Sequence, residues 1–179
     1  VICSGSLMGI HYKEIESNSV GYKEDYEMYS LDFEEFLWAK GYSETMIDSI
    51  YSHLETLRPF SDLEFDVLMN AFKDYMILGG MPEVVESWVT ERDIRKVDRL
   101  QRRILDDHSE IIKRYGGRLS ERILSVWSSI PTFLSRPNHK FIFRDLKKDG
   151  RASDFESSVQ WLSDAHLIHR VNQLDRHVF

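Results

Sequence analysis

The chain has 179 residues, 42% of them hydrophobic and 30% charged, and a formal net charge of −7 at pH 7, which fits one domain or two small ones with a buried core. Its only cysteine, Cys3, excludes an intrachain disulfide and a cysteine-based zinc site, and we expect a cytoplasmic protein. No window reaches the roughly 18 apolar residues that a membrane helix needs, so no membrane partner is expected.

The chain begins with features of strands. Residues 1–3 read as the end of a buried strand, and residues 26–31 alternate polar and apolar side chains as a second strand does. A helix is predicted next, because Asp32 and Glu35 have the spacing of a capping box, and Gly41 ends it.

Three further helices are predicted before residue 95. Apolar residues recur at helical spacing after Ser43 and again after Ser61 and Glu64, which form a second capping box. In the stretch Leu78-Gly79-Gly80-Met81-Pro82, the two glycines end one helix and the proline starts the next.

The second half begins with a long helix. Its apolar face starts at Ile94, and Gly116 and Gly117 end it. Another helix begins near Leu119, and Pro131 is expected to kink or end it near Phe133 and Leu134.

The last elements alternate between strand and helix. A short strand is predicted at residues 140–143, a helix at 153–165 and a strand at 167–171. This order is typical of a winged helix-turn-helix. The predicted fold class is therefore mainly α with short strands.

The charge is divided unevenly along the chain. Val1 to Arg95 holds 7 basic and 19 acidic residues, a net charge of −12, whereas Lys96 to Phe179 holds 16 basic and 11 acidic residues, a net charge of +5. The two halves are expected to have different tasks.

Three common sequence motifs of nucleotide binding, metal binding and hydrolysis are absent from the sequence. It contains no Walker A loop, no H-E-x-x-H and no G-x-S-x-G, so we expect no metal site and no independent hydrolase activity. Asp106, Asp107, His108 and Glu110 contain metal-ligand types, but consecutive helix residues point in different directions, and a polar helix face explains the run.

Five stretches occur in a fixed order: VICSGSLMGI, VGYKEDYEMYSLDFEEFLWAKG, YMILGGMPEVVESW, LQRRILDDHSEII and, with gaps, SIPTFLS, HKFIFRDL and RASDFESSVQWLSDAHLIHRV. Together they resemble the prokaryotic AAA-type ATPases, relatives of the STAND ATPases, that carry a C-terminal DUF4143 region. The resemblance covers essentially the whole chain.

The resemblance implies the middle part of a larger protein. A P-loop domain would precede this stretch, and a nuclease-like domain often follows it. Residues 1–42 would be the end of a RecA-like ATPase core, residues 43–95 a helical lid and residues 96–179 a winged-helix, DUF4143-like domain. The intact protein would bind ATP and Mg²⁺, and this part alone would hold neither.

The resemblance places the sensor-1 strand at the start of the chain. Ser4, with Gly5 and Ser6, would face the γ-phosphate, and a polar side chain at the carboxyl end of a parallel strand is where such sheets hold ligands. From the residues alone, the same stretch also reads as a strand-to-helix turn. Relatives often have a basic residue directly after glycine, at a position that the resemblance assigns to phosphate sensing. This chain has Tyr22 there and Lys23 one position later, so Lys23 is the candidate nucleotide contact, and a solvated lysine is the favoured alternative.

Gly79 to Pro82 matches the G-x-P element of the family's lid. The resemblance implies that Gly80 and Pro82 contact the adenine side of the nucleotide, whereas a plain turn between helices is the alternative. The aromatic spacing of residues 33–38, a family hallmark, reads as core packing.

The winged-helix half raises the question of DNA binding. Phosphate contacts would come from three basic residues before the presumed recognition helix, Lys147, Lys148 and Arg151. That helix carries no Lys or Arg, and its acidic residues are Asp154, Glu156 and Asp164. Phosphates repel such a helix, so packing against the lid or another protein domain is favoured over DNA.

Two hypotheses of different classes remain. In the first, the chain is the lid and winged-helix segment of a nucleotide-driven switch, without ATPase activity by itself. In the second, it is a protein- or DNA-interaction module with no nucleotide role.

Overall fold

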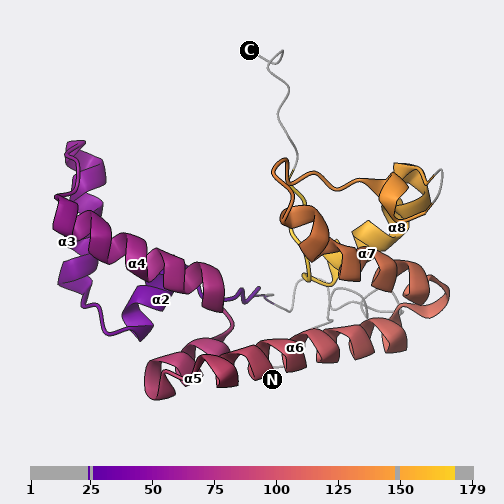
Figure 1. Ribbon diagram of the computed structural model, residues 1–179, viewed down its shortest axis with the longest axis horizontal. Coiled ribbons are helices and arrows are strands. Elements are labelled where there is room, and N and C mark those ends of the chain that lie inside the picture. Colours follow the sequence, from indigo (N-terminus) through magenta and orange to yellow (C-terminus); the bar gives the residue numbers. More distant parts are fainter. Residues whose placement is uncertain (1–23, 25, 148–149, 172–179) are drawn as a thin grey trace, which may run out of the picture. The chain divides into compact units, whose positions relative to one another are not determined.

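The computed structural model describes residues 24, 26–147 and 150–171, and Figure 1 shows how its helices follow one another. A strand occurs nowhere in these ranges, and the mainly α class is confirmed. The helices are α2 (Phe33–Ala39), α3 (Glu44–Thr56), α4 (Asp62–Leu78), α5 (Pro82–Glu91), α6 (Ile94–Tyr115), α7 (Ser120–Leu134) and α8 (Ala152–Asp164), with 3₁₀ turns η2 (Gly117–Leu119) and η3 (Phe143–Asp145).

The predicted strands at residues 26–31, 140–143 and 167–171 are wrong, because none of these segments pairs with another. Side chains of residues 26–30 are exposed, so their alternation buries no face. Leu167 and Ile168 both pack on one apolar cluster, which the opposite faces of a strand would prevent. The predicted strand at residues 1–3 lies outside the described residues.

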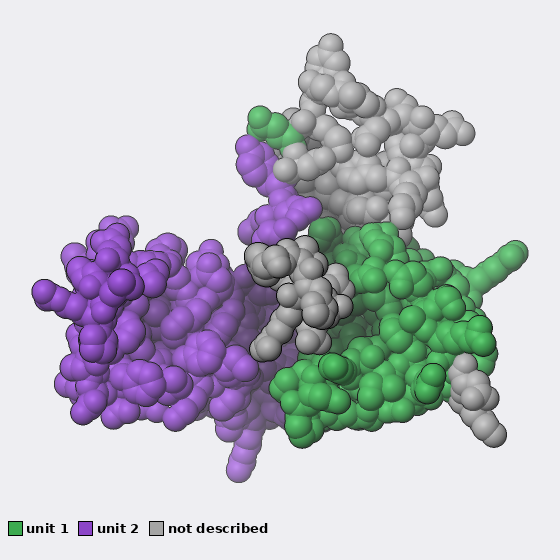
Figure 2. All heavy atoms as spheres, turned by 90° about the horizontal axis from the view of Figure 1, so that it is seen from above, with its two compact units in different colours: residues 1–24, 107–179 green, residues 25–106 purple. Residues whose placement is uncertain are grey.

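The chain divides into two compact units, drawn in purple and green in Figure 2. We call residues 25–106, drawn in purple and keyed as unit 2, the first unit; the second unit contains the chain from Asp107 onward and is drawn in green and keyed as unit 1. The division falls inside α6, whereas the sequence places boundaries after residues 42 and 95. Within the first unit, residues on both sides of the 42/43 boundary share one apolar cluster, since Leu37 of α2 packs with Ile47 of α3 and Ala71 of α4.

Both predicted capping boxes are confirmed. The Asp32 carboxylate accepts from the Glu35 amide at 2.8 Å, and the Glu35 carboxylate accepts from the Asp32 amide at 2.9 Å. Ser61 and Glu64 repeat this arrangement at the start of α4. Gly41 follows α2 with φ of 92°, a conformation that favours glycine.

The predicted core role of residues 33–38 holds for part of the helix. Phe33 packs against the cluster around Phe36, and the two rings contact Tyr75 with centroid distances of 5.6 and 5.3 Å. The Trp38 side chain is 47% exposed and lies outside that core.

In the second unit, α7 and α8 pack together over a core of buried apolar side chains. α7 continues through Pro131 and ends at Leu134, as predicted. The core residues are Ile112 of α6, Ile123 and Val126 of α7, and Phe155 and Leu162 of α8.

Within the part of the chain that the structure describes, no helix is both long and apolar enough to cross a lipid bilayer.

Candidate functional site

The turn between α4 and α5, residues 79–82, is the predicted site element that the structure describes in full. Gly80 is buried, and its carbonyl oxygen accepts a 2.8 Å hydrogen bond from the Leu31 amide. A Cβ built on Gly80 would lie 2.0 Å from the Leu31 carbonyl oxygen. Only glycine allows this approach of two backbones.

A second residue holds the same segment against α4. The Tyr75 hydroxyl donates to the Leu31 carbonyl oxygen at 2.9 Å. Leu31 therefore uses its amide on Gly80 and its carbonyl on Tyr75. The extended segment before α2 is fixed to the end of α4 and to the turn that follows it.

The opposite side of the turn is held by α6. The Gln101 side-chain amide donates to the carbonyl oxygens of Ile77 and Leu78 at 3.0 and 3.1 Å. These carbonyls belong to the last turn of α4, where no intrahelical partner exists. Gly79 then leaves the helix with φ of 71°, which L side chains rarely adopt.

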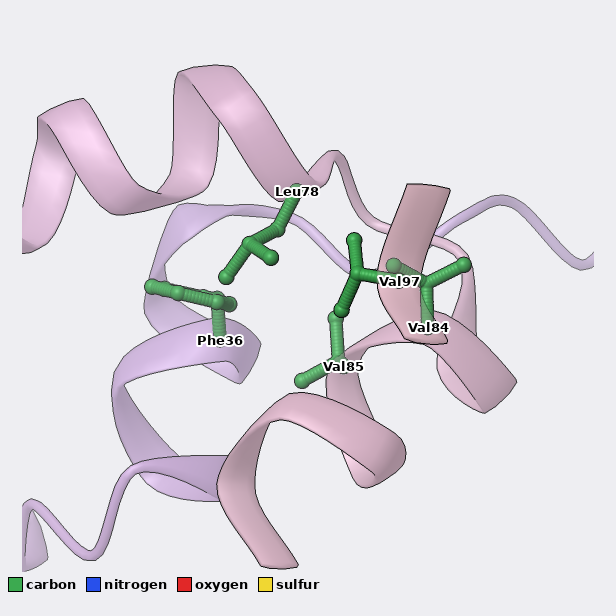
Figure 3. Close-up of a cluster of buried hydrophobic side chains, with 5 residues drawn as sticks. All are labelled: Phe36, Leu78, Val84, Val85 and Val97. Carbon is green, nitrogen blue, oxygen red and sulfur yellow. The ribbon is translucent and has the colours of Figure 1, made fainter. Parts of the chain in front are cut away.

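Beneath the turn lies an apolar cluster drawn from four helices, shown in Figure 3. Each of these side chains is buried, and together they fix the ends of α4 and α5 relative to α2 and α6. The members are Phe36, Leu78, Val84, Val85 and Val97.

The outer face of the turn is apolar and accessible. Met81 and Pro82 are exposed, and Pro82 is the first residue of α5. Glu83, in the first turn of α5, forms an ion pair with Arg103 of α6. Residues 79–82 have no charged side chain. The side chains of this surface are apolar, and the charged group that follows it in the sequence is the Glu83 carboxylate.

Other predicted nucleotide contacts cannot be placed. Ser4, Gly5, Ser6 and Lys23 lie outside the described residues. The structure therefore brings none of them together with Gly80 and Pro82.

The predicted nucleic-acid residues are described in part. Lys147 and Arg151 are exposed, and Lys148 lies outside the described residues. The Arg151 amide donates to the Asp154 carboxylate at 3.0 Å, which starts α8. Glu156 of α8 pairs with Arg170 at 3.1 Å. These two acidic side chains of α8 therefore have partners, and α8 itself carries no Lys or Arg.

Sequence patterns missed three residues that hold the turn: Leu31, Tyr75 and Gln101. Tyr75 lies one helical turn before Gly79, a position that could have been read from helical spacing. Leu31 and Gln101 contact the turn from far along the chain, and no local pattern marks such pairs.

A metal site is not evident in the described residues, because no group of three or more His, Cys, Asp or Glu side chains lies close enough to hold an ion. Asp106, Asp107, His108 and Glu110 lie on α6, with His108 stacked on Trp127 at 6.0 Å between ring centroids.

Comparison with known proteins adds one relationship. Residues 69–179, more than half of the chain and including the turn, match the family described as a domain of unknown function, DUF8612. No curated protein and no solved structure matches the chain.

Proposed function

The chain belongs to the DUF8612 family, and we propose that it is the lid and winged-helix segment of an ATP-binding AAA-type ATPase, which senses nucleotide without hydrolysing it alone. In this proposal the P-loop domain lies N-terminal to the segment and supplies the phosphate and Mg²⁺ contacts. The basis of the assignment is the resemblance of the sequence to that class of ATPase.

The observation that supports the proposal is the bond between Leu31 and Gly80. Leu31 belongs to the stretch that would leave the ATPase core, and Gly80 belongs to the turn that would face the base. One backbone hydrogen bond of 2.8 Å joins the two. A base packed on Pro82 would therefore act on an element fixed to both α4 and the incoming chain. That is the coupling a lid needs.

The proposal also assigns each segment of the chain to a part of the ATPase. Residues 1–42 would complete a RecA-like sheet, and α3 to α5 would be the lid. α7 and α8 would be the packed helices of a winged helix, whose wing segments at 140–143 and 167–171 form no strands among the described residues.

Nucleotide titration tests the proposal in the chain extended N-terminally through the P-loop domain. Pro82→Ala removes apolar contact area, so we expect ADP and ATP to bind about fivefold more weakly. Ser4→Ala should lower turnover. Pro59→Ala is the matched control, because Pro59 is also exposed in the first unit but lies in the loop between α3 and α4. Unchanged affinity and turnover in Pro82→Ala and Ser4→Ala would contradict the proposal.

The alternative function is a protein- or DNA-interaction module with no nucleotide role. Its DNA version predicts a salt-sensitive gel shift that is lost when Lys147, Lys148 and Arg151 are changed to Glu. The acidic residues of α8 favour a protein partner over DNA. Binding of DNA by the parent chain, with loss in the triple variant, would support the DNA version.

A further inference from the structure

The first unit contains a groove of about 280 Å³ whose lining residues are all apolar. None of its lining residues belongs to the turn at residues 79–82. Phe33 of α2 and Ile50 of α3 line two of its sides, and Phe60 lines it from the loop between α3 and α4. The fourth contribution comes from α4.

One face of α4 carries an apolar stripe that lines this groove and extends one turn past it. Phe65, Leu68, Met69 and Phe72 line the groove at helical spacing, and Met76 continues the same face one turn later. Phe65 is 51% exposed, Phe72 41% and Met76 69%. The stripe from Phe65 to Met76 spans about three helical turns. A continuous exposed apolar stripe is a candidate binding surface.

The stretch of chain that contains the groove is strongly acidic. Residues 26–91 contain 14 Asp and Glu but only 3 Lys and Arg. Asp62 and Asp66 lie one helical turn before Phe65 and Met69, on the same side of α4. Lys73 follows on that side one turn after Met69, so acidic groups outnumber basic ones there. This rim attracts cationic side chains.

Two further carboxylates are fixed beside the groove. Glu34 follows Phe33 and accepts a 2.6 Å hydrogen bond from Tyr51, the neighbour of Ile50. Near the other end, His53 stacks on Phe60 with 4.4 Å between centroids, and its Nε2 lies 3.7 Å from the Glu64 carboxylate. Each of these carboxylates is therefore held beside a residue that lines the groove.

The backbone limits how an occupant binds. The groove is built from helices, whose amides and carbonyls bond internally, so these elements offer no strand edge for pairing. Recognition must use side chains. A helix that places apolar residues at i, i+3 or i+4 and i+7 matches a groove between helices.

We propose that this groove binds an amphipathic helix of a protein partner, with an apolar face for the stripe on α4 and Lys or Arg side chains along its margins for the acidic rim. The inference does not depend on nucleotide binding. It rests on the accessible apolar surface and on the charge around it.

A synthetic peptide pair tests the proposal by fluorescence anisotropy against the full chain. Both peptides have about 14 residues, roughly four helical turns, with Leu on one face, and their other positions are Lys in one and Glu in the other. We expect the Lys peptide to bind with a Kd of about 10 μM that weakens as salt rises. The Glu peptide and a scrambled Lys peptide should bind at least about tenfold more weakly.

Two variants test whether the Lys peptide binds in the groove. Phe65→Ala combined with Phe72→Ala should weaken the Lys peptide about tenfold, whereas Leu105→Ala, at 51% exposure on α6, is the matched control and should leave it unchanged. Asp66→Lys should weaken the Lys peptide and strengthen the Glu peptide. Circular dichroism checks that each variant keeps its helices.

Three results would overturn the inference. The first is equal binding of the Lys, Glu and scrambled peptides, and the second is binding that the groove variants do not change. The third is a dimer of the parent chain, seen by sedimentation, that dissociates in the Phe65→Ala, Phe72→Ala variant, because the groove would then belong to a second copy.

Discussion

Leu31 and Gly80 meet backbone to backbone: the Leu31 amide donates to the Gly80 carbonyl at 2.8 Å, and a Cβ on Gly80 would lie 2.0 Å from the Leu31 carbonyl oxygen. Forty-nine positions separate them in the sequence, yet no side chain lies between them. This contact joins the chain before α2 to the turn between α4 and α5. The turn is therefore a tertiary junction as well as a connection between two helices.

Gly80→Ala is expected to destabilise the first unit by about 3 kcal/mol, because the added methyl group must displace backbone instead of a flexible side chain. Urea unfolding measures the change. Tyr75→Phe is the companion variant: it removes the hydroxyl that donates to Leu31 without adding volume, and it should cost about 1 kcal/mol. If Gly80→Ala lowers the free energy of unfolding no more than Tyr75→Phe does, the backbones of Leu31 and Gly80 do not approach as closely as described.

Gln101→Met is expected to lower the free energy of unfolding by about 1 kcal/mol. Methionine keeps the length of the side chain but cannot donate to the carbonyls of Ile77 and Leu78. The control is Gln160→Met on α8, where the exposed side-chain amide donates to Asp164 and accepts from Arg170, and a change within about 0.5 kcal/mol is expected because these bonds are exposed to solvent. Equal effects of the two substitutions would mean that Gln101 does not cap α4.

Local signals predicted the helices well, because each cap is made by residues close in sequence. Ser61 and Glu64 are three positions apart, and their capping box forms where the pattern places it. The predicted strand at 140–143 failed for the opposite reason. Phe141 and Phe143 alternate as strand residues do, but their rings pack on Phe133 and Phe155 of neighbouring helices, with centroids 4.5 and 5.8 Å apart.

The candidate site shows the same division. Glycine and proline at residues 79–82 marked the turn, because backbone freedom and a fixed φ act locally. The partners that hold the turn, Leu31 and Gln101, come from other elements and depend on how the helices pack. A single sequence carries no local mark of such contacts.

Glu64 gives α4 a pH-dependent contribution to stability. The Ser61 hydroxyl and amide donate to its carboxylate at 2.6 and 2.8 Å, and the hydroxyl is the main reason that the pKa of Glu64 falls below its usual 4.5. A lowered folded-state pKa means that this stabilisation is present above pH 4.5 and is lost as the pH falls through the folded-state value.

The Glu64→Gln variant should therefore be less stable than the parent near neutral pH. The difference between their free energies of unfolding should become smaller as the pH falls below 4.5. Urea unfolding between pH 3 and 7, in steps of about one unit, measures this difference. When Glu64→Gln is made in a protein that already carries Ser61→Ala, its effect on the free energy of unfolding should depend much less on pH. The Ser61 hydroxyl, the main hydrogen-bond donor to the Glu64 carboxylate, is then absent. If Ser61 is intact and the difference in free energy of unfolding between the parent and Glu64→Gln does not change with pH, ionised Glu64 does not stabilise α4.

Ser158 is a polar residue in the apolar core of the second unit. Its side chain is fully buried, and among the described residues its hydroxyl has no hydrogen-bond partner. Such a hydroxyl lowers stability, because it gives up its bonds to water and gains none in return. Ser158→Ala removes the oxygen, leaves a very small space and is expected to stabilise the protein by about 1 kcal/mol.

Thermal unfolding followed by circular dichroism checks the effect, and the melting temperature should rise by about 2–4 °C. Ser157→Ala is the matched control, because Ser157 is the exposed neighbour on α8 and its loss should change stability by less than about 0.5 kcal/mol. Ser158→Val should instead destabilise the protein, since it adds volume to a closed core next to Phe155 and Leu162. A loss of stability in Ser158→Ala would mean that the hydroxyl has a partner, and the core of α7 and α8 would then need a polar contact that these packed apolar side chains do not supply.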